Sequence, residues 1–188
     1  MSEPGRQRLL TYADYAALPD DGHRYQLLEG ELVMTPSPNR WHQQISIRLA
    51  SDVLNHVQVR GLGEAFAAPL DVTLDDRNVV QPDILFVSNE RSGILQGSRV
   101  IGAPDLCVEI LSPGTERIDR MRKLELYARF GVTHYWIVDL DTRTIEEYAL
   151  AGDVYRVRSI TAYDAPFRPA ALPGFEFRLN VVALPDGA

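Results

Sequence analysis

VVQPDILFV (residues 79–87) and DLCVEIL (residues 105–111) decide how this chain folds. Both are short apolar runs, which predicts two buried strands, and the second is apolar on both faces and therefore expected at the centre of a sheet. Each run carries one acid, Asp83 in the first and Glu109 in the second. A buried carboxylate is unfavourable without a partner, so both acids need a reason to be there. Pro82 interrupts the first strand and predicts a sheet edge or a bulge.

Patterns on either side of these two strands predict further strands and helices. We expect helices at residues 11–19, 41–59 and 112–130, hairpins over residues 25–34 and 144–160, strands at residues 64–74 and 133–139, and a surface loop or short helix at residues 89–99. In the long helix the apolar stripe consists of Ile45, Leu49, Val53 and Val57, widened by Ile47 and Leu54.

This order of elements predicts an α/β or α+β fold. The length suits one domain over residues 1–188, with a core at about residues 25–150 and a C-terminal hairpin and tail at residues 151–188. We expect the apolar residues of the tail to pack on the body of the domain.

The composition is that of an ordinary soluble globular protein, with 45% hydrophobic and 24% charged residues. No apolar run approaches the roughly 18–20 residues that cross a bilayer, and residues 1–10 lack the apolar centre of a signal peptide. The single cysteine, Cys107, lies in an apolar run and is expected to be a buried, inert thiol. These features predict a cytoplasmic protein with no membrane partner.

The net charge of −7 argues against a protein that coats DNA through its overall charge. A metal-dependent nuclease remains compatible with it, because a cation held by carboxylates reverses the local field. DNA would then bind through a local basic patch. The best local candidate is the group of arginines around Lys123, although a solvated face of mixed charge explains them equally well. These are Arg117, Arg120, Arg122 and Arg129.

Lys123 is the one lysine in the chain, beside eighteen arginines. Arginine cannot replace lysine where a compact ammonium is required. Asp119, Lys123 and Tyr127 are spaced four apart and share one helix face. Since this helix follows the Glu109 strand directly, the ammonium could reach a substrate phosphate or the attacking water. The alternative is an exposed pair of Asp119 and Lys123, worth a few tenths of a kcal/mol.

Asp83 and Glu109 can converge on one cation if their strands are neighbours. Mg²⁺ suits such a site, since it is bound by one or two carboxylates, waters and phosphate oxygens. His42, at the start of the long helix, could contact the attacking water or a phosphate, although a lone histidine more often caps or packs. The other histidines, His23, His56 and His134, do not have the spacing of a zinc site.

Taken together, these segments resemble the Uma2 family of restriction-endonuclease-like proteins, within the PD-(D/E)xK nuclease superfamily. The resemblance covers about residues 12–150. It rests on the segments Tyr25–Leu32, Pro38 with His42-Gln43, Val80–Val87, Gly102–Leu106, Val108–Pro113, Lys123, Tyr127, Gly131-Val132 and Tyr135–Asp139.

The resemblance implies a restriction-endonuclease-like core, a mixed central sheet flanked by helices, with the hairpin of residues 25–34 at its N-terminal side. It implies Mg²⁺-dependent hydrolysis of DNA phosphodiester bonds, with Mn²⁺ as a substitute, and a homodimer by analogy. The implied metal ligands are Asp83, Glu109 and the Ile110 carbonyl. Lys123 would orient or activate water, and His42 and Glu31 would assist.

Two positions depart from the pattern of the superfamily. The usual lysine, two residues after the second acid, would fall at Leu111, and Lys123 resembles a migrated replacement. Gln26 stands where relatives commonly carry Glu, which could weaken a metal or water contact unless Glu31 compensates. These departures and the acidic surface favour one alternative, a catalytically degenerate nuclease-fold module that binds DNA or a protein partner. A second alternative is an enzyme acting on RNA or on a small phosphodiester.

Overall fold

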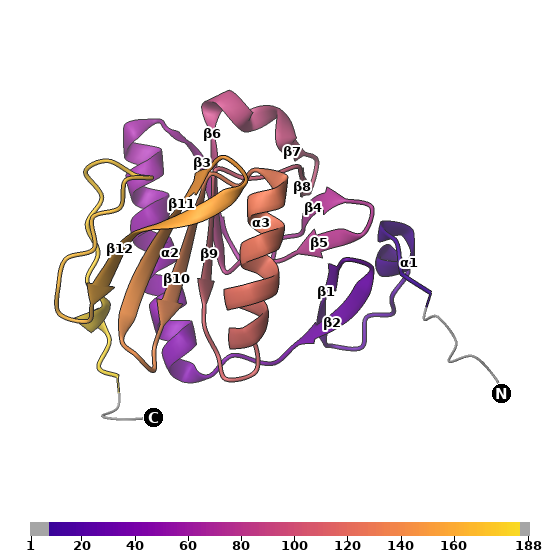
Figure 1. The fold of residues 1–188 in the computed structure, drawn as a ribbon, viewed down its shortest axis with the longest axis horizontal. Coiled ribbons are helices and arrows are strands. Elements are labelled where there is room, and N and C mark those ends of the chain that lie inside the picture. Colours follow the sequence, from indigo (N-terminus) through magenta and orange to yellow (C-terminus); the bar gives the residue numbers. More distant parts are fainter. Residues whose placement is uncertain (1–7, 185–188) are drawn as a thin grey trace.

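The computed structural model describes residues 8–184, which form two six-stranded sheets and flanking helices (Figure 1). Sheet A has the strand order β2-β1-β5-β4-β8-β7, and sheet B the order β12-β11-β10-β9-β6-β3. The mixed α and β fold is therefore confirmed, but strands that we expected in one central sheet are divided between two. Our expectations for residues 1–7 and 185–188 lie outside the described residues.

The strands of sheet A are short and come mainly from the first half of the chain. They are β1 (Arg24–Leu28), β2 (Glu31–Thr35), β4 (Val72–Asp75), β5 (Asn78–Val80), β7 (Leu95–Gln96) and β8 (Arg99–Ile101). The strands of sheet B are β3 (Gly63–Ala67), β6 (Ile84–Ser88), β9 (Leu106–Ile110), β10 (His134–Asp139), β11 (Thr144–Ala151) and β12 (Val154–Ala162). Sheet B is mixed, because β9 and β10 are parallel while its other pairs are antiparallel.

The helices lie mainly on the two faces of sheet B. They are α1 (Tyr12–Ala16), α2 (Arg40–Arg60) and α3 (Leu124–Phe130), with the π-helical turn η2 (Ile118–Lys123) running directly into α3 and the short 3₁₀ turns η1 (Asn89–Ile94) and η3 (Leu179–Val181). Figure 1 shows α3 in front of the sheet and α2 behind it. None of the helices in residues 8–184 is long and apolar enough to cross a membrane.

Pro82 marks the point where the chain passes from sheet A to sheet B. The strand predicted over residues 79–87 is two strands, β5 in sheet A and β6 in sheet B. Proline has no N–H to donate to a ladder, so neither strand continues through it. The expectation of a sheet edge or bulge was wrong, since β6 lies between β9 and β3. The strand predicted over residues 64–74 divides in the same way, into β3 and β4.

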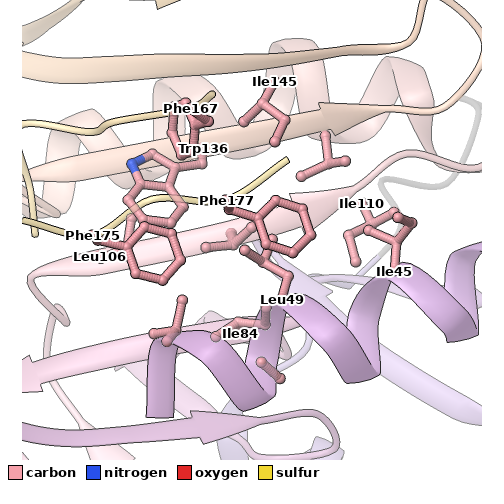
Figure 2. Close-up of a cluster of buried hydrophobic side chains, with 14 of the residues drawn as sticks. Ile45, Leu49, Ile84, Leu106, Ile110, Trp136, Ile145, Phe167, Phe175 and Phe177 are labelled. Carbon is pink, nitrogen blue, oxygen red and sulfur yellow. The ribbon is translucent and has the colours of Figure 1, made fainter. Parts of the chain in front are cut away.

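One hydrophobic core fills the space between α2, sheet B and the C-terminal tail (Figure 2). The predicted stripe of α2 is buried here at Ile45, Leu49, Val53 and Val57. Its proposed widening was wrong, because Ile47 is 67% exposed and Leu54 is 37% exposed. The tail packs as expected, through the buried side chains of Phe167, Leu172, Phe175, Phe177, Leu179 and Val182.

A second core lies on the opposite face of sheet B, under α3 and against sheet A. Successive side chains of a strand point to opposite faces, so Cys107 and Leu111 of the β9 segment face α3 while Leu106 and Val108 face α2. Cys107 is buried and free, as predicted. The same alternation places Glu109, which lies between Val108 and Ile110, on the α3 face.

Candidate functional site

Five of the six residues that we predicted for the site line a single cleft. They are His42, Asp83, Glu109, Ile110 and Lys123. The cleft opens between β1, the segment before β6, the end of β9 and the turn η2, and its volume is about 30 Å³. That is room for one or two water molecules.

Asp83 and Glu109 approach each other because β6 and β9 are antiparallel neighbours. Their register pairs Leu85 with Cys107 and Ile84 with Val108, and one further step brings Asp83 opposite Glu109. Both acids therefore point to the α3 face of sheet B. The Oδ2 atom of Asp83 accepts the backbone N–H of Ile110 at 2.8 Å, which ties the two strand ends together.

Lys123 reaches Glu109 from the helical segment above the sheet. Its Nζ lies 2.9 Å from Oε1 of Glu109 and 3.0 Å from Oδ1 of Asp119. The side chain is only 3% exposed, so the pair with Asp119 is deeply buried and the alternative of an exposed surface pair was wrong. A π-helical turn is often associated with a functional site, and here it carries both Asp119 and Lys123.

Two buried tyrosines hold this arrangement in place. Tyr127 donates its hydroxyl to Oε1 of Glu109 at 2.8 Å, and Tyr135 donates to the backbone carbonyl of Asp119 at 3.1 Å. The four-residue spacing placed Tyr127 on the face of Lys123, but no pattern in the chain indicated that its hydroxyl binds Glu109. The contact comes from the packing of α3 on β9.

The hydrogen bonds to each acid are made at one of its two oxygens. Lys123 and Tyr127 both contact Oε1 of Glu109, while Ile110 and His42 both contact Oδ2 of Asp83. Within residues 8–184, Oε2 of Glu109 and Oδ1 of Asp83 accept no hydrogen bond, in contrast to Oε1 and Oδ2. Two carboxylate oxygens in one cleft that accept no hydrogen bond are available to a cation.

The electrostatics of the cleft favour an additional positive charge. Burial raises the pKa of Glu109 to about 8, and the nearby carboxylates of Asp119 and Asp83 add to the rise while Lys123 opposes it. Burial disfavours the charged form of Lys123, but Asp119 and Glu109 outweigh it and raise the lysine pKa above its ordinary value. The raised pKa of Glu109 means that the metal-free cleft favours a proton or another cation beside this carboxyl group, even with the charged Lys123 in contact.

His42 and Gln26 support the Asp83 side of the cleft. The Nε2 atom of His42 lies 3.3 Å from Oδ2 of Asp83, and Asn39 caps α2 just before it by accepting the His42 backbone N–H. The side chain of Gln26 accepts the backbone N–H of Gln81 at 3.1 Å and donates to Thr35. Gln26 thus fixes the segment that leads into Asp83.

Glu31 is the predicted residue that the structure does not bring to the cleft. Its side chain is 63% exposed and forms an ion pair of 2.9 Å with Arg122. The hairpin register pairs Glu31 with Leu28, beside the turn, whereas Gln26 pairs with Val33 in the middle of the hairpin. The sequence suggested that Glu31 compensates for Gln26. The structure corrects this expectation, because the side chain of Glu31 is turned to solvent.

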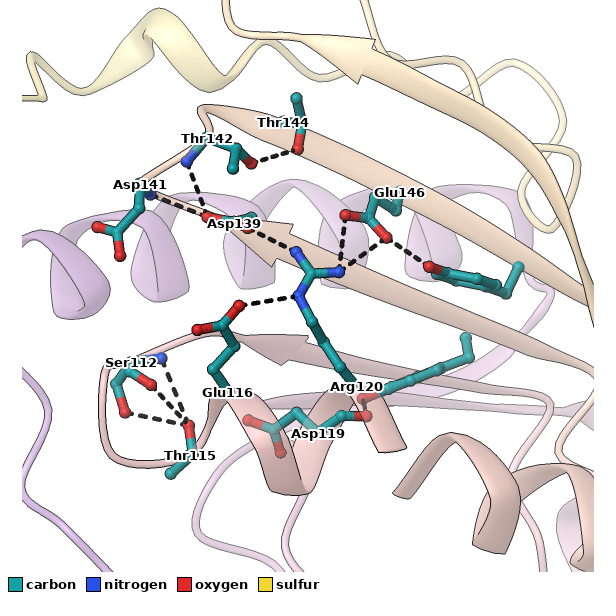
Figure 3. Close-up of polar contacts among 12 residues, drawn as sticks. Ser112, Thr115, Glu116, Asp119, Arg120, Asp139, Asp141, Thr142, Thr144 and Glu146 are labelled. Atoms are coloured by element: carbon teal, nitrogen blue, oxygen red, sulfur yellow. Dashed lines mark hydrogen bonds and ion pairs between the residues drawn. The ribbon is translucent and has the colours of Figure 1, made fainter. Parts of the chain in front are cut away.

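The arginines around Lys123 do not form a free basic patch. Arg120 binds Asp139 and Glu146, from β10 and β11, together with Glu116 (Figure 3). Arg122 pairs with Glu31, and Arg129 pairs with Glu29. Among the four, Arg117 alone has no ion pair to the described residues. The interpretation as a face of mixed charge therefore holds, since three of the guanidinium groups are already paired with acids.

The donor set of the cleft fits a hard divalent cation. The described residues contain no group of three or more His, Cys, Asp or Glu side chains arranged to hold a metal. Two carboxylates and a main-chain carbonyl are nevertheless a sufficient set for Mg²⁺, which keeps several of its waters. Asp83, Glu109 and the carbonyl of Ile110 are the oxygen atoms that could hold it.

The fold and the cleft together define a nuclease-like α+β protein, with two acids on neighbouring strands and a lysine beside them. The chain belongs to the Uma2 family, described as "Putative restriction endonuclease", and the match covers residues 12–181. The membership expected from the sequence is confirmed.

Two individual proteins are similar to this chain, one in structure and one in sequence. A crystal structure described as that of "a putative nuclease belonging to DUF820", from Anabaena variabilis, superposes with a TM-score of 0.74 at 22% identity, over 91% of this chain and 96% of that chain. At this identity the likeness supports the fold. An uncharacterized protein from Synechocystis sp. is 29% identical over 106 residues, which are 56% of this chain and 54% of that protein. The match therefore spans about half the length of that relative.

Proposed function

We propose that this protein is a Mg²⁺-dependent endonuclease that hydrolyses DNA phosphodiester bonds. The observation that carries the proposal is the meeting of Asp83, Glu109 and Lys123 in one cleft, with Nζ of the lysine 2.9 Å from Glu109. The three residues come from two strands and one helical turn far apart in the sequence. Membership of a family described as restriction endonucleases supports the same class of reaction.

The charge of the cleft supports a divalent cation as cofactor. The acidic residues of the cleft, Asp83, Glu109 and Asp119, outnumber its cationic residues, Lys123 and Arg24. When bound, Mg²⁺ or Mn²⁺ would supply a Lewis acid for the phosphate and lower the pKa of a water molecule. The oxygens of Asp83 and Glu109 that accept no hydrogen bond, together with the Ile110 carbonyl, would hold it.

The side chains of the chain itself supply orientation and charge. Lys123 is fixed between Glu109 and Asp119, so its ammonium can stabilise charge that develops on the phosphate or position the attacking water. His42 orients Asp83 through the contact at Oδ2. Leu111 leaves no second lysine on the strand, which makes Lys123 the one ammonium available for this role.

DNA is the proposed substrate, and a homodimer is the proposed assembly. Two symmetry-related clefts would allow one assembly to cut both strands of a duplex. We propose the dimer by analogy with the superfamily, and hydrolysis of one strand in a single cleft does not require it.

The test is nicking of supercoiled plasmid DNA in Mg²⁺ or Mn²⁺, with EDTA as the metal-free control. We expect activity from the wild type and from Asp52→Ala, which changes an exposed acid of α2 outside the cleft. Asp83→Ala and Lys123→Met should lose at least about a hundredfold, the size of effect seen when a group acting on the transition state is removed.

Equal cleavage by all four proteins would assign the activity to a contaminant or the site to other residues. Absence of metal-dependent cleavage on DNA, with activity on RNA or on a small phosphodiester, would change the substrate class. No cleavage of any of these substrates would favour the module that binds without catalysis.

A further inference from the structure

Arg24 is a cationic residue of the cleft that takes no part in the contacts among Asp83, Glu109 and Lys123. It lies on β1, two residues before the buried Gln26, so both side chains point to the same side of the strand. Both line the cleft that contains Asp83 and Glu109. Arg24 is half-buried, whereas Gln26 is buried, so the guanidinium is the more accessible of the two.

The guanidinium of Arg24 has no partner in the described part of the chain. No ion pair, hydrogen bond or ring contact joins it to any of residues 8–184. The three arginines on the neighbouring helical segment that form ion pairs, Arg120, Arg122 and Arg129, are used by acids of β10, β11 and the β1–β2 hairpin. Arg24 is therefore not part of a structural ion-pair network.

The second cation of the cleft cannot take over the binding of an incoming anion. Lys123 is 3% exposed and is held by Glu109 and Asp119 at 2.9 and 3.0 Å. To turn outward it would have to leave two buried carboxylates without a partner, which is strongly unfavourable. Arg24 is therefore the cationic side chain of the cleft that is free to bind a negatively charged ligand.

We propose that Arg24 binds a non-scissile phosphate of the DNA strand, one that neighbours the phosphate held over Asp83 and Glu109. This inference rests on the proposed function and specifies its substrate as a polynucleotide with at least two consecutive phosphates. A guanidinium presents a planar fork of donors that matches a phosphate bidentately. Its charge also offsets the repulsion between the acids of the cleft and a polyanion.

The first measurement is binding of a short fluorescein-labelled DNA duplex, without divalent metal so that nothing is cleaved, by fluorescence anisotropy at several salt concentrations. Arg24→Gln should weaken binding about tenfold, as expected for a charge-assisted hydrogen bond, and reduce the slope of log K against log salt by about 1. Arg24→Lys should keep the slope and lose part of the affinity. Arg156→Gln, an exposed arginine of β12, should change neither.

The second measurement is turnover in Mg²⁺ on the same duplex and on bis(para-nitrophenyl) phosphate, which has a single phosphodiester. Arg24→Gln should raise KM for DNA, leave kcat close to the wild-type value, and leave the small diester unaffected. A positioning role in folding would instead lower activity on both substrates.

The outcomes separate this inference from the proposed function. Unchanged affinity and salt slope in Arg24→Gln, or no DNA binding by the wild type, would overturn the role of Arg24. Metal-dependent cleavage with the same KM for DNA in Arg24→Gln and the wild type would overturn this role and leave the nuclease proposal standing. Binding that depends on Arg24, with no cleavage by any variant, would overturn the nuclease proposal alone.

Discussion

Nζ of Lys123 lies 2.9 Å from Oε1 of Glu109, although the two residues come from different elements. The position two residues after Glu109, where the sequence resemblance led us to expect a lysine, is Leu111. Leu111 shares the face of Glu109 but packs in the core under α3. The ammonium group of Lys123, on the helical turn η2, contacts the carboxylate of Glu109 instead. The helix thus supplies the charge that the strand does not.

The hydroxyl of Tyr127 positions Glu109, so removing it should reduce activity more than stability. Tyr127→Phe loses one buried hydrogen bond, a cost of about 1 kcal/mol. Because the partner is a proposed metal ligand, we expect activity or metal affinity to fall about 10-fold to 100-fold. Plasmid nicking and urea unfolding give the two quantities.

Tyr155→Phe is the matched control for this change. Tyr155 donates its hydroxyl to the carbonyl of Val132 at 2.7 Å, outside the cleft. It should lose similar stability with normal activity. Equal activities for Tyr127→Phe and the wild type would show that the contact with Glu109 has no positioning role.

Arg120 joins the helical turn η2 to sheet B and should be important for stability. Arg120→Gln would leave Asp139 and Glu146, both buried, without their cation. We expect the free energy of unfolding in urea to fall by about 2 kcal/mol, since unpaired buried carboxylates are costly. Arg168→Gln removes an exposed pair with Glu176 and should cost less than about 1 kcal/mol. Similar losses in the two variants would contradict this account.

Glu109 should make the stability of the metal-free protein depend on pH. Burial, with Asp119 and Asp83, raises its pKa from 4.5 to about 8 in the folded state. An acid whose pKa rises on folding stabilises the fold at low pH and loses that contribution as pH increases. The melting temperature in EDTA should therefore fall between about pH 4.5 and pH 8, and Mg²⁺ should reduce the fall by stabilising the carboxylate.

Glu109→Gln serves as the reference for this pH profile, because it removes the titrating group and keeps the shape of the side chain. The difference between wild type and variant isolates Glu109 from the other groups that titrate in the same range. A wild-type melting temperature that falls no more steeply than that of Glu109→Gln would be evidence against the raised pKa.

Gln26→Glu should tighten binding of the metal. The side-chain oxygen of Gln26 already accepts the backbone N–H of Gln81, and a carboxylate can do the same. The substitution adds a negative charge to the wall of the cleft, and the number of charged ligands tunes cation affinity. Calorimetry should show about a tenfold lower dissociation constant for Mg²⁺. Gln44→Glu, on the exposed face of α2, should leave the constant unchanged; an unchanged constant in both would rule out a contribution from residue 26.

Local patterns predicted the parts of the site that depend on local geometry. Alternation along β9 faces Glu109 toward α3, and helical spacing aligns Asp119 with Lys123 and Tyr127. Asp83, Glu109, Lys123 and His42 were expected together from these patterns and Ile110 from the family resemblance, and all five lie in one cleft in the structure. Their chemical roles remain proposals.

Features that depend on contacts between distant segments could not be predicted. Pro82 was correctly seen to interrupt a strand, but which sheet each half joins is decided by pairing with β9 and β1, far along the chain. The arginines near Lys123 were ambiguous because the acids that bind them lie in other elements. Arg24 could have been noticed as a polar residue alternating with Gln26, but only the folded cleft shows that it has no partner.

The most direct test of this account is the binding of Mn²⁺, followed by electron paramagnetic resonance as metal is added to the protein. The account predicts that the wild type and Asp52→Asn bind a single Mn²⁺ ion per chain, and that Asp83→Asn and Glu109→Gln lose this site while remaining folded. A wild type that binds no Mn²⁺, or equal Mn²⁺ binding by all four proteins, would contradict the account.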